Sequence, residues 1–190
     1  AILKEIDIRV ALHIYLHEHV VDMLDEPLIV DELGVLEGSY RVDLALIDRQ
    51  LQGFEIKSAS DNLNRLPAQQ KHFGSVFDRM TLVCDQKHVK EAMAIVPSWW
   101  GLICVSEKDD RAHLNEIWPS RLNQKVDPYA VCQLLWRDEA LALLKEHGMD
   151  HYFRSSSRKK MWRALAKELE PKEIRQAVKR KLCERPDWRQ

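Results

Sequence analysis

The sequence has no apolar run that approaches the ~18 residues needed for a membrane-spanning helix. Its first residues, Ala-Ile-Leu-Lys-Glu-Ile-Asp, mix charged with apolar side chains and are not typical of a secretory signal peptide. Hydrophobic residues make up 45% and charged residues 31% of the 190 residues, a balance that argues against a disordered chain. We therefore expect a globular protein with a buried core and no membrane partner.

Cysteine is scarce, with four residues, and none of them forms a CxxC pair. This spacing does not favour a disulfide framework or a zinc ribbon. Cys84 and Cys104 lie within apolar, strand-like segments, where buried and reduced thiols are the common outcome. The other two are Cys132 and Cys183. A reducing, cytoplasmic location is therefore expected.

Motifs of several enzyme classes are also missing. There is no P-loop, no GxGxxG motif after a strand and no GxSxG nucleophile elbow. His13 and His17 share a helix face, but Val21 stands where an HExxH zinc motif that begins at His17 needs its second histidine. A zinc site there is a minor alternative, and Glu18 of the same helix is a candidate acid for a metal site.

Charge is distributed unevenly although the formal net charge is only −1. From Arg154 to the C-terminus there are 13 Lys and Arg and 5 Asp and Glu, a charge of +8. The rest of the chain then has 16 basic and 25 acidic residues, a charge of −9. A basic helical segment is suited to contact a phosphate backbone, but a solvated helix surface has the same composition, and both alternatives stay open.

Hydrophobic periodicity and turn residues predict an α/β protein. The first helix is predicted by apolar residues that recur at three- and four-residue steps: Ile6, Val10, Leu12, Ile14, Leu16, Val20, Val21 and Leu24. The predicted helices span 2–24, 67–78, 86–95, 128–147, 155–169 and 171–183, and the predicted strands span 28–33, 40–47, 51–57, 81–84, 101–105 and 114–118. We expect an αβββαβ core with a mixed sheet flanked by helices over residues 1–125, and a helical C-terminal extension with a basic tail over residues 126–190.

The second and third strands are predicted to form an antiparallel hairpin. With a turn centred on Arg49, Asp43 lies opposite Glu55, and Arg41 lies opposite Lys57. Period-two geometry places these four side chains on one face and the apolar side chains on the other. The hairpin is therefore expected to have one apolar face and one row of charged side chains.

Two carboxylates at the ~5 Å spacing of paired residues repel each other unless a cation lies between them. Mg²⁺ accepts such ligands, together with water and phosphate oxygens. We therefore expect Asp43 and Glu55 to hold Mg²⁺ or Mn²⁺, with the backbone carbonyl of Ile56 as an extra ligand. Lys57 is placed to orient a water molecule or to stabilise charge on a phosphate. A solvent-exposed hairpin face with cross-strand ion pairs is the alternative.

Asp43, eleven intervening residues and then Glu55-Ile56-Lys57 resemble the D-(x)n-ExK signature of the PD-(D/E)XK nuclease superfamily. The predicted αβββαβ order is similar to the restriction-endonuclease-like core of that superfamily. Further segments resemble one bacterial and phage branch with poorly defined biology, so that the resemblance covers most of the chain; they are Arg41-Val42-Asp43, Glu55 to Ser58, Asp61, Arg65 to Pro67, Gln69, Phe77-Asp78, Trp99 to Gly101 and Leu135 to Arg137.

The resemblance implies that Asp43 and Glu55 are metal ligands and that Lys57 is the catalytic lysine. Gln69 resembles the Q-xxx-Y element beside the metal site of some branches, although Phe73 replaces the tyrosine. Val42 stands where the signature has proline. Glu32 is a candidate further ligand, or a turn residue. The candidate nucleic-acid contacts are Arg41, Ser58, Arg65, Lys159, Lys160 and Arg163.

The expected function is metal-dependent hydrolysis of phosphodiester bonds in DNA, with RNA less favoured. An alternative from another class is a nucleic-acid-binding or protein-interaction module that has a nuclease-like scaffold but does not cleave. Pairing into a homodimer through the Trp-rich C-terminal half is left open.

Overall fold

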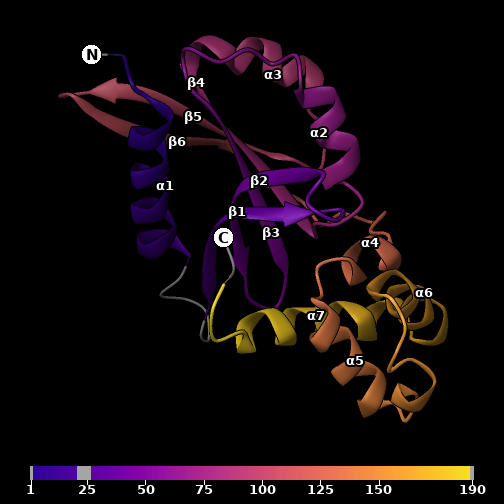
Figure 1. Ribbon diagram of the computed structural model, residues 1–190. Coiled ribbons are helices and arrows are strands. Elements are labelled where there is room, and N and C mark those ends of the chain that lie inside the picture. Colours follow the sequence, from indigo (N-terminus) through magenta and orange to yellow (C-terminus); the bar gives the residue numbers. More distant parts are fainter. Residues whose placement is uncertain (1, 21–26, 189–190) are drawn as a thin grey trace.

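The computed structural model describes residues 2–20 and 27–188, and it contains a mixed six-stranded sheet in the order β1-β2-β3-β4-β5-β6 (Figure 1). The strands are β1 (Leu28–Val35), β2 (Tyr40–Ile47), β3 (Leu51–Lys57), β4 (Arg79–Asp85), β5 (Gly101–Lys108) and β6 (Arg111–Trp118). The helices are α1 (Glu5–His19), α2 (Leu66–Phe73), α3 (Val89–Ile95), α4 (Pro128–Cys132), α5 (Arg137–Glu146), α6 (Arg158–Glu168) and α7 (Pro171–Glu184). Strands β3, β4 and β5 are parallel, and the other pairs are antiparallel. The expected α/β class with a helical C-terminal extension is confirmed.

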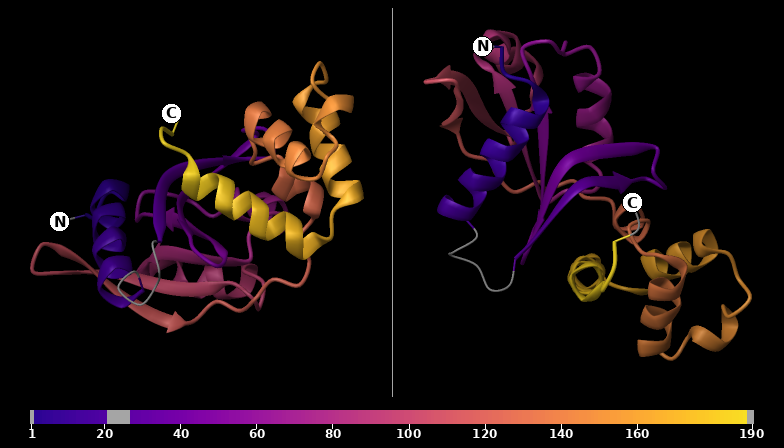
Figure 2. Two further views of the ribbon diagram at one scale, coloured as in Figure 1. Left: turned by 90° about the horizontal axis from the view of Figure 1, so that it is seen from below. Right: turned by 60° about the vertical axis from the view of Figure 1, so that its left-hand side comes forward.

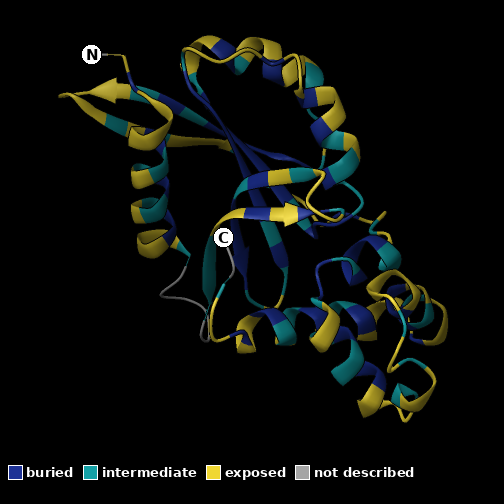
Figure 3. Cartoon of the chain, in the orientation of Figure 1, coloured by how far each residue is buried: buried dark blue, intermediate teal, exposed yellow. Residues whose placement is uncertain are grey.

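Apolar side chains cover both faces of the sheet. On one face, α1 packs on a cluster that includes Leu44, Phe54 and Val83. On the other face, α2 and the C-terminal helices share a larger cluster, to which the sheet contributes residues such as Val42 and Ala45. The central strands are accordingly dark blue in the burial colouring (Figure 3). The expectation of one apolar and one polar hairpin face is therefore wrong, because helices cover both faces.

Helix α1 buries Leu12 and Leu16 of the predicted apolar set and, in addition, Ile8. Ile8 and Leu12 are fully buried, whereas Ile6, Val10 and Ile14 are more than half exposed. Both sets recur at four-residue steps, so periodicity alone could not identify the buried one. The helix ends at His19, and the last part of its predicted range, from residue 21, lies outside the described residues.

The regular alternation of β2 is interrupted at Asp43. Leu44 faces α1, but Val42 packs in the opposite cluster with Ala45, although strict alternation would place Val42 beside Leu44. The β1–β2 register pairs Asp31 with Leu44 and Leu33 with Val42 but skips Glu32 and Asp43 between them, and the backbone of Glu32 is left-handed with φ 57°. Val42 and Leu44 therefore lie on opposite faces of the sheet, although they are only two residues apart.

The β2–β3 hairpin has the predicted register over its paired part. The pairs run from Ile47–Leu51 to Leu44–Phe54, as a turn centred on Arg49 requires. The described ladder ends there, so neither of the two expected pairs, Asp43 with Glu55 and Arg41 with Lys57, belongs to it. On the other edge of β2, Arg41 pairs with Gly34 of β1.

The prediction of one helix over 128–147 is wrong, because this segment forms two helices, α4 and α5. The segment between α4 and α5 presents two carbonyl groups to side chains from later in the chain. Leu134 O accepts from Arg185 Nη2 at 3.1 Å, and Leu135 O accepts from Trp162 Nε1 at 3.2 Å. These donors replace the amide donors of a continuous helix. Gly148, with φ 70°, follows α5 as predicted.

The helices α4 to α7 gather at the end of the molecule away from the β5–β6 hairpin (Figure 2). Buried Asp78 fixes α7 to the sheet, since its carboxylate lies 3.7 Å from both Arg175 and Lys179 and also accepts from Leu51 N at 2.7 Å. Helix α2 ends at Phe73 rather than at Asp78, which is thereby available for this role. None of the helices in residues 2–20 and 27–188 combines the length and the apolar character needed to cross a membrane.

Candidate metal centre

Glu55 and Lys57 lie at the end of β3, and Glu55 is the most buried acidic residue of the site, with 3% of its surface exposed. Glu55 Oε1 accepts from Lys57 Nζ at 2.8 Å and from Gln69 Nε2 of α2 at 2.5 Å. Glu55 Oε2 and Gln69 Oε1 are buried without a hydrogen-bond partner among the described residues. A buried carboxylate oxygen in this state is costly unless a ligand satisfies it.

Asp43 is joined to the same strand by a main-chain hydrogen bond. Ile56 N donates to Asp43 Oδ2 at 2.6 Å, just beyond the last β2–β3 pair. Burial, and the nearby negative charge of Glu55, raise the pKa of Asp43 to about 7. Burial also raises the pKa of Glu55, although Lys57 and Gln69 act in the opposite direction. The two carboxyl groups therefore form one electrostatically coupled pair.

A second group of acids adjoins Asp43. One carboxylate oxygen from each of Glu5, Glu32 and Asp43 lies within 4.8 Å of the others. Arg9 lies among them. Its Nη2 donates to Glu5 Oε1 and to Glu32 Oε1, each at 2.6 Å. Its Nη1 donates to the main-chain carbonyl of Asp43 at 2.5 Å. Although burial acts in the opposite direction, these acids raise the pKa of Arg9, so the guanidinium is a resident cation of the group.

The structure thus brings together Asp43, Glu55, Ile56, Lys57 and Gln69, and it places Glu32 beside Asp43. Sequence analysis missed Glu5 and Arg9. Their four-residue spacing on one helix face was the available signal, but nothing in the sequence relates that face to β2. The helix-borne acid of the site is Glu5, whereas Glu18 is exposed near the other end of α1 and belongs to no ligand group among the described residues.

The predicted nucleic-acid contacts fall into two regions. Arg41 and Arg65 are exposed near the site, and the charge of Arg65 acts to lower the pKa of Glu55. Ser58 is buried, and its amide and hydroxyl both donate to Asp61 Oδ2, at 2.7 and 2.6 Å. Ser58 thus organises the loop after β3.

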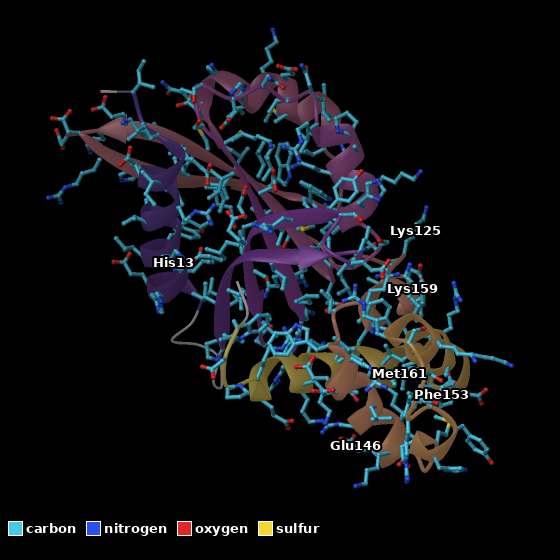
Figure 4. All side chains as sticks on the ribbon, viewed as in Figure 1. His13, Lys125, Glu146, Phe153, Lys159 and Met161 are labelled. Carbon is cyan, nitrogen blue, oxygen red and sulfur yellow. The ribbon has the colours of Figure 1, made fainter. Side chains whose placement is uncertain are left out.

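The basic residues of α6 form the other region. Lys159 lies 3.4 Å from Glu37 in the β1–β2 turn, while Lys160 and Arg163 are exposed. Lys159 lies on the other side of the molecule from His13 of α1 (Figure 4). His13 Nε2 is 3.0 Å from Asp31 Oδ1, and neither His13 nor His17 belongs to a metal-ligand group in the part of the chain that the structure describes.

Fold and site together define an α/β protein with two neighbouring carboxyl groups and a buried lysine at the end of an inner strand of a mixed sheet. The chain belongs to the Bacteriophage P4 protein cII family, whose profile matches residues 2–188. Protein cII of Enterobacteria phage P4 is 30% identical over 177 residues, which cover 93% of this chain and 66% of that protein. The chain therefore spans slightly less than two thirds of the length of that relative.

One solved structure is also similar to the chain. It is a protein of unknown function from Silicibacter pomeroyi, with 20% identity and a TM-score of 0.39, and the similarity covers 70% of this chain and 83% of that one.

Proposed function

We propose that this protein is a metal-dependent nuclease of the PD-(D/E)XK type that hydrolyses phosphodiester bonds in DNA. One observation carries the proposal: Glu55 is buried with Oε2 unpartnered, beside Asp43 and in contact with the Lys57 ammonium. A hairpin with only surface ion pairs would leave these groups exposed to water. Here they are desolvated and coupled, as at sites built for chemistry.

The residues present fit a divalent ion. Two coupled carboxylates at a buried strand end are hard oxygen donors, and the unpartnered Glu55 Oε2 is available to a ligand. Asp43, Glu55 and the main chain of Ile56 would hold Mg²⁺ or Mn²⁺, and Glu32 and Glu5 lie near enough to Asp43 to add donors. Such an ion polarises a phosphate and lowers the pKa of water.

The protein groups have separate tasks in this proposal. Lys57 Nζ offers a positive charge that orients the attacking water and stabilises charge that develops on the phosphate. Gln69 holds Glu55 Oε1, which fixes the orientation of that carboxylate. Arg41 and Arg65 supply exposed positive charge close to the site. DNA is favoured over RNA only by the resemblance to the PD-(D/E)XK superfamily. The four thiols form no disulfide in the structure, which supports action in the cytoplasm.

The test is cleavage of labelled DNA and RNA with Mg²⁺ or Mn²⁺. Asp43→Asn and Lys57→Ala are each expected to lower the rate by at least about 100-fold. Asp109→Asn is a matched control, because Asp109 lies in the β5–β6 turn with φ 52°, which asparagine tolerates. Unchanged cleavage in both site variants would remove this mechanism.

A second candidate is a nucleic-acid-binding module without cleavage. The observation that favours it is the exposed face of α6, where Lys160, Arg163 and Lys167 have no acidic side-chain partner among the described residues. Calorimetric titration with Mn²⁺ separates the candidates. Retained DNA affinity without Mn²⁺ binding would favour the module.

A further inference from the structure

A groove of about 740 Å³ lies between the β1–β2 hairpin and the C-terminal helices. Strand residues such as Glu32, Gly34 and Arg41 form one wall. The other wall includes Trp136, Arg158 and Trp188 from the helical extension. The groove is therefore built from two parts of the chain that are distant in sequence, and its volume lies within the ~300–1,000 Å³ typical of ligand sites.

Two arginines supply positive charge in this groove. Arg41 is exposed, and its side chain has no hydrogen-bond or ion-pair partner in the described part of the chain. Arg158 rests on Trp162 and lies 3.7 Å from Glu37, but its side chain is 55% exposed. An exposed ion pair of this kind is weak, so a phosphate can compete with Glu37 for Arg158.

Aromatic side chains line the same groove. Trp136 and Trp188 flank the Arg185 guanidinium, whose Cζ lies 3.8 Å and 4.4 Å from the two ring centroids. Arg185 is committed to Glu139 and to the Leu134 carbonyl, so it holds the indoles in place. Half-buried indoles held in this way suit stacking with a flat ligand.

The groove reaches the candidate metal centre through Glu32. Glu32 lines the groove and also belongs, with Asp43, to the acidic group around Arg9. The acids in the groove have other basic partners, since Arg9 binds Asp31 and Glu32, and Lys159 lies near Glu37. Anionic ligands in the groove therefore meet mainly Arg41 and Arg158.

We propose that this groove binds a single-stranded segment of nucleic acid next to the scissile phosphodiester, with Arg41 and Arg158 on phosphates and Trp188 on an unstacked base. The proposal rests on the proposed function and specifies its substrate as a strand end, flap or gap. Paired bases in a duplex are already stacked and hydrogen-bonded, so the indole faces are accessible only to an unpaired base. Arginines combined with aromatic side chains are the usual means of binding single strands.

The test is fluorescence anisotropy of a labelled oligothymidylate and of a duplex of equal length, with the full chain in EDTA so that nothing is cleaved. The single strand is expected to bind at least about fivefold more tightly than the duplex. Arg41→Gln and Arg158→Gln are each expected to weaken single-strand binding about fivefold and to reduce the salt slope by about one. Arg111→Gln, in the distant β5–β6 hairpin, is the matched control.

Trp188→Leu provides an independent readout, because the single strand should quench tryptophan fluorescence in the wild type and less in this variant. Arg41 lies outside the Arg185 contacts, so Arg41→Gln remains informative if Trp188→Leu loosens the extension. Equal affinity for duplex and single strand, or unchanged binding by both arginine variants, would overturn the proposal. Single-strand binding in the groove without any cleavage would contradict only the proposed nuclease function. Cleavage that does not change in the groove variants would contradict only the proposed role of the groove.

Discussion

Arg9 Nη2 lies 2.6 Å from Glu32 Oε1, which joins the first helix to the edge strand at the centre of the acidic group. The guanidinium also contacts Glu5 and the main chain of Asp43, and its side chain is only 13% exposed. One positive charge therefore balances several carboxylates that would otherwise repel one another at short range. In the absence of a metal ion, Arg9 makes this arrangement of acids stable.

Replacing Arg9 with glutamine should destabilise the metal-free protein. Loss of a hydrogen bond to a charged group lowers the free energy of unfolding by about 1.5–3 kcal/mol. For a chain of this size, each kcal/mol lowers the melting temperature by roughly 2–4 °C. Saturating Mn²⁺ should restore more stability to Arg9→Gln than it adds to the wild type, because the ion replaces the missing cation. Thermal unfolding in EDTA and in Mn²⁺ measures both effects, with Arg111→Gln as the control. Identical melting temperatures of Arg9→Gln and wild type in EDTA would contradict this role.

Between weakly acidic and neutral pH, the stability of the metal-free protein should change with pH because Asp43 loses its proton in this range. Its pKa is raised from 3.8 to about 7 by burial and by Glu55. Between these values the folded state binds more protons than the unfolded state, so stability falls as the pH rises and levels off above about pH 7. Asp43→Asn should flatten this part of the curve.

Melting curves from pH 5 to pH 8 in EDTA would test this dependence. Mn²⁺ affinity should rise over the same interval, because the ion competes with the proton on Asp43. The wild type and Asp43→Asn should differ in slope and not only in melting temperature. Parallel curves for the two proteins would show that Asp43 titrates in its ordinary range.

Local sequence patterns predicted much of the site because most of its contacts are local. Asp43, Glu55 and Lys57 lie on adjacent strands of one hairpin, and the turn at Arg49 determined the register of its paired part, from Ile47–Leu51 to Leu44–Phe54. Gln69 was suggested only by the resemblance, and in the structure it reaches Glu55 across the β3–α2 connection.

The parts that could not be predicted depend on long-range contacts. Glu5 and Arg9 reach β1 and β2 only after α1 packs on the sheet, and the buried stripe of α1 is chosen by that packing. The break between α4 and α5 depends on donors from Trp162 and Arg185, which follow 27 and 51 residues later. The interruption at Asp43 coincides with the left-handed Glu32, a conformation that glutamate seldom adopts and that no propensity favours.

Lys57→Met should be strongly destabilising at pH 8, because it leaves the buried Glu55 carboxylate without its ammonium partner. Removing one member of a buried pair typically costs about 3–5 kcal/mol. The double variant Glu55→Gln/Lys57→Met should recover most of this loss, since no buried charge of the pair then remains. A double-mutant cycle by urea unfolding, with Glu55→Gln alone as the second single variant, measures the coupling. Strictly additive effects of the two substitutions would show that Lys57 and Glu55 do not stabilise each other.

The C-terminal extension should depend on Arg185 far more than on its other basic residues. Arg185 is buried, donates through Nε and Nη2 to Glu139 at 2.7 and 2.6 Å, and stacks between two tryptophans. Arg185→Ala should cost about 3–5 kcal/mol, because Glu139 is left without its partner. Arg185→Lys should recover only part of the loss, since an ammonium cannot make the two-pronged contact or stack in the same way.

Arg180→Gln is the matched control for this prediction, because Arg180 pairs with Glu146 on an exposed surface, where such a pair contributes only about 0–1 kcal/mol. Urea unfolding should therefore separate Arg185→Ala from Arg180→Gln by several kcal/mol. Tryptophan fluorescence, to which Trp136 and Trp188 contribute two of the six indoles, should change only in the Arg185 variants. If Arg185→Ala costs no more than Arg180→Gln, the helical extension is held by its apolar core alone, and the indoles that line the groove are not positioned by Arg185.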